Sequence, residues 1–221
     1  MDSNSTNSNS KSLQPFLLGI TGSIGTGKSL VGEILKEYSI FVIDTDNLVK
    51  EIMSTKNKVT QKIVEEFGGT VISGKKDEYI DKKKLAKIVF EDGFRLKKLE
   101  SIIHPEVLKL LTDLVNLNKE KSLIAALIPL LFECNLESYF NEKWCVKCDR
   151  EIQMQRLLSR GYTNKEANDR INAQFTQDEK AKRSDFVIDN SKSKDYTKEQ
   201  IVKRLKLLVQ SNHNFHLSFD K

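Results

Sequence analysis

Short apolar runs alternate along this chain with longer segments in which apolar residues recur every three or four positions. The runs are continuous rather than alternating, which is typical of strands covered on both faces. Such strands are expected at residues 16–20, 41–43, 123–128, 144–146 and 186–188. Helical periodicity predicts helices at residues 28–38, 46–53 and about 195–211. Strands that alternate with helices predict an α/β fold with a parallel sheet flanked by helices.

The stretch from residue 55 to 118 has a different pattern. It contains no strong strand signal, and Val107 and Leu111 share one face of an expected helix. Pro105 stands just before them and is well placed to open that helix, because the first turn does not need its missing N–H. We therefore expect a helical insertion beside the sheet at 55–118, and a second, charged helical stretch at 150–183.

The N-terminal segment is rich in Ser, Asn and Thr, so residues 1–14 are expected to form a disordered tail. Residues 15–215 are expected to form one domain. Its core is expected to comprise about residues 15–54, 119–149 and 184–211. We expect a cytoplasmic protein, because the tail lacks the apolar segment of a signal peptide and the three cysteines provide no disulfide framework. No apolar run reaches the roughly 20 residues that a membrane span requires.

Composition narrows the function classes. Of the 221 residues, 38% are hydrophobic and 30% are charged, which favours a folded domain over a disordered chain. The formal net charge is only +5, so an acidic small-molecule ligand is a better expectation than a nucleic acid. Neither a membrane nor a nucleic acid is an expected partner.

The strongest chemical signal is the motif GSIGTGKS, which matches G-x-x-x-x-G-K-[ST], the P-loop of nucleotide-binding proteins. Its glycines allow a tight turn that brings backbone N–H groups to phosphate oxygens. Lys28 would contact the β- and γ-phosphates of ATP, and the Ser29 hydroxyl would bind Mg²⁺. The expected ATP-binding residues are Gly22, Ser23, Ile24, Gly25, Thr26, Gly27, Lys28 and Ser29.

A P-loop indicates a nucleotide but not a reaction. The chain contains neither N-K-x-D nor D-x-x-G, two motifs of GTPases, and it lacks the L-S-G-G-Q motif of transporter ATPases. A small-molecule kinase remains. Phosphoryl transfer relies on positioning and charge stabilisation, so such an enzyme needs a carboxylate near the acceptor hydroxyl and cations near the transferred group.

Asp44 and Asp46 follow the second expected strand, at the edge where open parallel sheets bind their ligands. Asp44 could serve Mg²⁺ through water, and Asp46 could deprotonate the acceptor hydroxyl. Asp46 could equally be a helix N-cap, a position that favours Asp. Arg156 and Arg160 lie four residues apart on an expected helix, so they could close over the γ-phosphate as a lid or simply face solvent.

Beyond the P-loop, the order and spacing of several further segments resemble the dephospho-coenzyme A kinase family, over about residues 17–208. The matching segments are Gly19–Ser29, Val42–Asp46, Phe67-Gly68, Leu85 with Val89-Phe90, Ile103–Pro105, Ile128–Glu133, Gln155–Leu157 with Arg160, Arg170-Ile171 with Gln174, and Asp185–Asn190. The resemblance implies a P-loop NTPase core with a helical substrate-binding insertion and a helical lid. It also implies phosphorylation of the ribose 3′-hydroxyl of dephospho-CoA by ATP with Mg²⁺, the last step of CoA biosynthesis.

The resemblance implies roles for particular residues. Asp46 would be the catalytic base, and Arg156 and Arg160 would contact the phosphates of ATP from the lid. Asn190 would lie near adenine. His104 in the insertion, and Pro129 and Leu130 after a central strand, would border the site of dephospho-CoA.

Some positions depart from the family pattern. Lys82 stands where Arg is usual, which keeps the charge and loses the two-pronged geometry of a guanidinium. The family's Pro-Gly after the second helix is missing, and residues 54–57 occupy that region. These departures concern contacts with the acceptor more than the phosphate chemistry.

Two other function classes stay open on the sequence. A P-loop kinase with another acceptor, such as a nucleoside, would share the phosphate site and differ in the insertion. A regulatory nucleotide-binding or RNA-binding protein would bind its ligand without turnover, although Lys28, Ser29 and Asp46 are all present.

Overall fold

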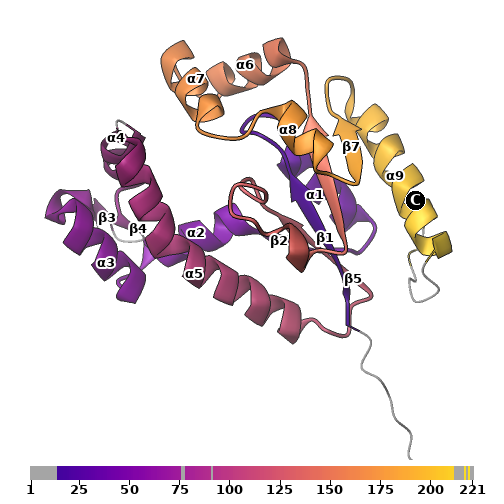
Figure 1. Ribbon diagram of the computed structural model, residues 1–221, viewed down its shortest axis with the longest axis horizontal. Helices are drawn as coiled ribbons and strands as arrows, with labels where there is room; N and C mark the ends of the chain where they lie inside the picture. Colours follow the sequence, from indigo (N-terminus) through magenta and orange to yellow (C-terminus); the bar gives the residue numbers. More distant parts are fainter. Residues whose placement is uncertain (1–13, 76–77, 91, 212–216, 218, 220–221) are drawn as a thin grey trace, which may run out of the picture.

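A computed structural model describes residues 14–75, 78–90, 92–211, 217 and 219. Its centre is a five-stranded parallel sheet with the strand order β2-β5-β1-β6-β7 (Figure 1). The strands are β1 (Phe16–Thr21), β2 (Phe41–Asp44), β5 (Leu123–Leu127), β6 (Glu142–Lys147) and β7 (Phe186–Asp189). Each of the five predicted strands is therefore confirmed, with small differences at the ends. Residues 1–13 of the expected tail lie outside the described residues.

Helices cover both faces of the sheet. Every residue of β5 is buried, and successive side chains of a strand point to opposite faces. Leu123 and Leu127 pack with α1 and α9 on one face, whereas Ile124 packs with α2 and α5 on the other. These helices are α1 (Lys28–Glu37), α2 (Thr45–Ser54), α5 (Gly93–Leu117) and α9 (Lys194–Ser211). The three predicted helices and the flanked parallel sheet are confirmed.

The expectation that residues 55–118 contain no strand is wrong. A small antiparallel pair, β3 (Ile72–Lys75) and β4 (Glu78–Ile80), lies among the helices of this region. Strands of three and four residues show too few alternations to give a period-two signal. The other elements here are α3 (Lys58–Phe67), the 3-10 turn η1 (Gly69–Val71) and α4 (Lys82–Phe90).

The predicted helix start at Pro105 is also wrong, because α5 runs through this residue. An interior proline removes one backbone hydrogen bond and costs about 3 kcal/mol. The exposed Pro105 nevertheless interrupts a stripe of residues that is buried on both sides of it, Leu99 and Ile103 before and Val107 and Leu111 after. Burial of this stripe against the α2 and β5 side of the core offsets the cost of the proline.

The charged stretch after β6 forms three short helices, α6 (Arg150–Ser159), α7 (Asn164–Asn172) and α8 (Gln177–Lys182). Thr163 and Thr176 begin α7 and α8 as capping boxes, in which each hydroxyl accepts from the backbone N–H three residues later. In Figure 1 these helices lie above the sheet, on a different side from α3, α4 and the hairpin. The remaining turn is η2 (Glu137–Tyr139). No helix within the described ranges is long and apolar enough to cross a membrane.

Candidate active site at the carboxyl edge of the sheet

The carboxyl ends of the parallel strands bring the predicted site residues to one edge of the sheet. β1 leads directly into the P-loop, β2 ends at Asp44, and β5 leads to Pro129. The register pairs Asp44 with Leu127, and the Thr21 hydroxyl donates to the Pro129 carbonyl at 3.1 Å. This edge therefore carries the phosphate loop, the two aspartates and the Pro129 segment. In open parallel sheets, ligands bind at the carboxyl ends of the strands.

The P-loop has the backbone geometry of an anion site. Gly27 is the N-cap of α1 in a left-handed conformation, with φ at +104°, and it provides no side chain to occupy the helix N-terminus. A Cβ at Gly27 would lie 1.8 Å from Nδ2 of Asn190, so only glycine fits there. The N–H groups of Lys28 and Ser29, in the first turn of α1, are placed to donate to phosphate oxygens.

Lys28 bends back over the loop, and its ammonium donates to the Gly22 carbonyl at 2.7 Å. Burial lowers the pKa of Lys28 to about 8, and Asp46 partly offsets the effect by favouring the charged form. A buried ammonium that lacks a full set of partners is suited to receive phosphate oxygens.

The affinity for ATP should fall as the pH rises through about 8. The P-loop motif predicts that ATP pairs with the ammonium form of Lys28, so above this pKa binding would also take up a proton, with a limiting change of about tenfold per pH unit. The check is calorimetric titration with ATP between about pH 7 and pH 9.5. A Lys28→Arg variant, whose side chain stays charged, should lose this dependence, and an equal dependence in both proteins would contradict the assignment.

The two aspartates after β2 have different structural roles. The Asp44 carboxylate caps α2 by accepting from the backbone N–H of Asp46 at 3.0 Å. The alternative that Asp46 is the N-cap is therefore wrong, because the helix begins one residue earlier than expected. Asp46 keeps its carboxylate for the cleft, where desolvation raises its pKa and the charge of Lys28 opposes that rise.

A pocket of about 200 Å³ opens beside Asp46. It brings together four residues that the sequence selected as acceptor-binding, Asp46, His104, Pro129 and Leu130. The rest of its lining is mainly apolar and comes from α2, α5 and the segment after β5, except for Gln174, which lies between α7 and α8. The other lining residues are Thr45, Val49, Val107, Leu108, Leu111, Ile128, Cys134, Leu136 and Gln174. Cys134 and Gln174 were not selected as site residues. Nothing local distinguishes Cys134 from a packing residue, and Gln174 stood only among the segments that resemble the family.

His104 contacts the free thiol of Cys134, with 3.6 Å between Nδ1 and Sγ. Desolvation lowers the pKa of His104 and raises the pKa of Cys134 to about 11. Both side chains are consequently neutral near pH 7. They present polar but uncharged surface to the pocket.

Arg156 and Asn190 lie at the P-loop, and both bind its backbone. The Thr26 carbonyl accepts from Nδ2 of Asn190 at 2.7 Å and from Nη1 of Arg156 at 3.2 Å. Thr197 completes the set by donating to Oδ1 of Asn190 at 2.9 Å. Arg160 is separate: it is the exposed C-cap of α6, beyond the last helical residue. The structure therefore brings Arg156, but not Arg160, to the loop.

Ser29 and Asp44 offer the kind of donor set that Mg²⁺ prefers. Both supply hard oxygen atoms, from a hydroxyl and a carboxylate. Ser29 is exposed in the first turn of α1, and Asp44 uses one carboxylate oxygen for its cap. Within the described residues no group of three or more His, Cys, Asp or Glu could hold a metal ion. A metal here would therefore depend on nucleotide phosphates and water for its remaining ligands.

A buried ion pair joins α8 to the segment after β5. Lys180 has no exposed side-chain surface, and its ammonium lies 2.7 Å from Oε1 of Glu133. The same ammonium donates to the Pro129 carbonyl at 2.6 Å. Sequence reasoning gave Lys180 no role, because one lysine in a charged helix carries no sign of burial. Its place shows that α8 is anchored to the wall of the pocket.

Glu133→Ala should lower the free energy of unfolding by about 3 kcal/mol, because it leaves the Lys180 ammonium buried without its counter-charge. Urea unfolding measures the change. The matched double variant, Glu133→Leu with Lys180→Met, removes both charges and should recover most of the loss. An unchanged midpoint for Glu133→Ala would show that the ion pair contributes little.

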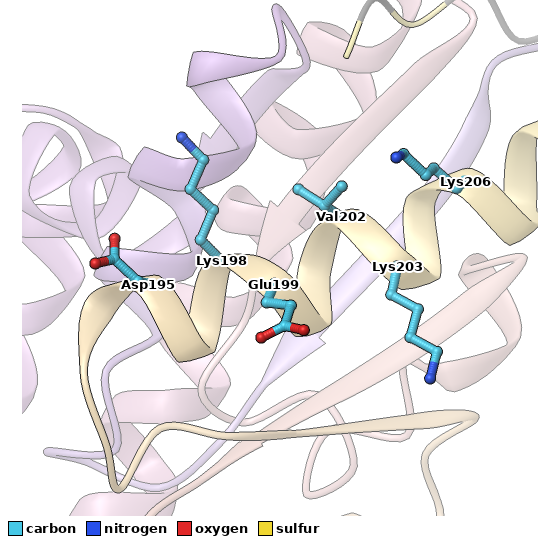
Figure 2. A pocket seen from close by; sticks show the side chains of 6 residues that line it. All are labelled: Asp195, Lys198, Glu199, Val202, Lys203 and Lys206. Atoms are coloured by element: carbon cyan, nitrogen blue, oxygen red, sulfur yellow. The ribbon is translucent and has the colours of Figure 1, made fainter. Parts of the chain in front are cut away.

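A second hollow, of about 510 Å³, follows α9, and the described residues that line it all belong to that helix (Figure 2). Lys198 and Lys203 point to different sides of the helix in Figure 2, so the lysines do not converge on one point. Asp195 and Glu199 alternate with them, and Lys198 is bound to Glu37 of α1 at 2.8 Å. This mixture of charges is that of a solvated helix face.

Comparisons with known proteins agree with this geometry. Residues 16–195 match the family model described as dephospho-CoA kinase. The dephospho-CoA kinase of Carboxydothermus hydrogenoformans is 40% identical over 189 residues, which cover 84% of this chain and 91% of that protein. That of Oceanobacillus iheyensis is 39% identical, with 84% of this chain and 94% of that protein covered.

Solved structures extend the comparison to the fold. The dephospho-CoA kinase from Campylobacter jejuni superposes with a TM-score of 0.64 and 28% identity, covering 89% of this chain and 98% of that one. A Thermus thermophilus protein gives a TM-score of 0.76 and 32% identity, covering 89% of this chain and 99% of that one. Shikimate kinase from Acinetobacter baumannii, with 15% identity and a TM-score of 0.50, covers 90% of this chain and shares the fold.

Proposed function

Because this chain belongs to the dephospho-CoA kinase family, we propose that the P-loop at the carboxyl edge binds ATP and that the pocket beside Asp46 binds the acceptor. The enzyme uses ATP to phosphorylate dephospho-CoA, and the products are CoA and ADP. The observation that supports this division is the position of Asp46. It lines the pocket, and its ionisation responds to the charge of Lys28 in the P-loop.

On the phosphate side, the N–H groups of the P-loop and the Lys28 ammonium hold the β- and γ-phosphates. These groups are fixed before ATP arrives, so they stabilise the charge of the transferred phosphoryl group without reorganisation. Ser29 and Asp44 would hold Mg²⁺, which supplies further charge neutralisation when bound. Their hard oxygen atoms fit that ion.

On the acceptor side, the carboxylate of Asp46 accepts the proton of the ribose 3′-hydroxyl while the oxygen of that hydroxyl attacks the γ-phosphorus of ATP and ADP leaves. The raised pKa of Asp46 suits this role, because a general base works best when its pKa approaches the working pH. His104, Pro129 and Leu130 contact the rest of dephospho-CoA, whose apolar parts match the lining of the pocket.

Arg156 has a structural and a charge role in this proposal. By binding the Thr26 carbonyl it helps to orient the Thr26–Gly27 peptide, whose N–H then faces the phosphates. Its charge adds to the positive potential of the loop. Asn190 binds the same carbonyl and would reach adenine through its neighbouring loop, whereas Arg160 would need α6 to α8 to close over ATP.

The first experiment follows ADP release from Mg-ATP with dephospho-CoA, adenosine, several nucleoside monophosphates, shikimate or water as acceptor. The proposal expects release that depends on dephospho-CoA, with CoA identified by mass. Release that depends on adenosine instead would favour the kinase with another acceptor. ATP binding without any release would favour the regulatory alternative.

A further inference from the structure

Gln174, in the segment between α7 and α8, lies where the phosphate loop and the acceptor pocket meet. Its Oε1 atom accepts from the backbone N–H of Ile24, in the P-loop, at 2.9 Å. The same side chain lines the pocket that holds Asp46 and His104. No other residue of the segment between β6 and β7 lines that pocket within the described part of the chain.

The contact with the P-loop fixes how the side-chain amide is turned. The N–H of Ile24 can only donate, so the oxygen of the amide must face it and the NH₂ group must face away. Among the residues that the structure describes, none accepts a hydrogen bond from Nε2 of Gln174. The amide therefore keeps two N–H donors on the side away from Ile24.

The backbone next to Gln174 is held from two directions. The N–H of Phe175 donates to Oε1 of Glu133 at 2.9 Å, and the Phe175 carbonyl accepts from the Ser23 hydroxyl at 3.3 Å. Glu133 is itself fixed by the buried ammonium of Lys180. These contacts anchor residue 174 between the P-loop and the pocket wall, so the amide is in place before a substrate binds.

The other polar side chains of the pocket are already engaged. The Thr45 hydroxyl donates to the Leu127 carbonyl at 2.9 Å, His104 contacts Cys134, and Asp46 has the role of base. The remaining lining is mainly apolar. An acceptor with several oxygen atoms needs donors to orient it in such a pocket, and the NH₂ group of Gln174 supplies two N–H groups for this purpose.

We propose that Gln174 is a substrate-contacting residue that determines how the acceptor is oriented. Its Nε2 donates to an oxygen of dephospho-CoA while its Oε1 remains on the N–H of Ile24. One planar amide thus sets the acceptor relative to the phosphate loop, which is the alignment that phosphoryl transfer requires. This inference rests on the proposed function of the cleft.

Two substitutions distinguish the role of the amide oxygen of Gln174 from the role of its NH₂ group. Gln174→Glu keeps an oxygen for the Ile24 N–H and loses the donor, whereas Gln174→Met has nearly the same length and loses both. We expect the KM for dephospho-CoA to rise about tenfold in both variants. For Gln174→Glu the KM for ATP should be unchanged. Asn172→Asp introduces the same negative charge at an exposed site two residues away and should behave like the wild type.

Calorimetric titration of each variant with dephospho-CoA alone gives a second readout, with the same expected loss of affinity. If Gln174→Glu binds and phosphorylates dephospho-CoA like the wild type and only Gln174→Met is impaired, the residue merely braces the P-loop and the inference is overturned. A rise in KM that Asn172→Asp shares would overturn it too, because charge alone would explain the change. Failure of the wild type to use dephospho-CoA would instead overturn the proposed function.

Discussion

Lys28→Ala should reduce kcat by about a thousandfold, the size of effect that follows removal of one preorganised group from a transition state. The ammonium donates to the Gly22 carbonyl at the base of the P-loop, and in the proposed function it contacts the phosphates of ATP. The charge that develops during transfer would lose its nearest side-chain cation. The measurement is dephospho-CoA-dependent ADP release at saturating ATP.

The loss of activity in Lys28→Ala should not be accompanied by a loss of stability. Burial already disfavours the charge of Lys28, so its removal should not lower the free energy of unfolding. Urea unfolding tests this point. Lys36→Ala in the exposed last turn of the same helix is the matched control and should keep full activity. Near-normal turnover of Lys28→Ala would remove this lysine from the mechanism.

Asp46→Asn should lower kcat by about 100-fold to 10,000-fold, the usual contribution of a general base, and leave the KM for ATP unchanged. The amide keeps the shape of the side chain and cannot accept the proton of the hydroxyl. In the wild type, activity should fall at acidic pH as Asp46 becomes protonated. Its raised pKa places this fall at a higher pH than an ordinary aspartate would. The acidic limb should be absent from the variant.

Asp44→Ala provides the contrast for stability. Asp44 caps α2, so its removal should cost about 1 kcal/mol, whereas Asp46→Asn should leave the unfolding midpoint in place. If Asp46→Asn instead lost stability and kept its turnover, the carboxylate would have a structural role only. Turnover therefore tests the role of Asp46, and the unfolding midpoint tests the role of Asp44.

The strands and the P-loop could be predicted because their signals are local. A strand covered on both faces is expected to be a short continuous apolar run, and β1, β2 and β5 have that pattern. The edge strand β7 has the same kind of run, although its Val187 is exposed. Gly27 and Lys28 belong to a motif whose residue spacing follows from the geometry of phosphate binding. The hairpin of β3 and β4 was missed because its strands are too short to give a period-two signal. The course of α5 through Pro105 was missed because burial of residues on both sides of the proline against distant parts of the chain decided it.

The sequence by itself determined the class of fold, the phosphate loop and the two aspartates after β2, because continuous apolar runs and motif spacing need no partner to be recognised. Only the tertiary structure decided which arginine reaches Thr26 and that Lys180 is buried against Glu133. It also decided that Gln174 joins the P-loop to the acceptor pocket. These roles depend on contacts between residues up to 150 positions apart in the chain, such as Ile24 and Gln174, and packing rather than local pattern creates such contacts.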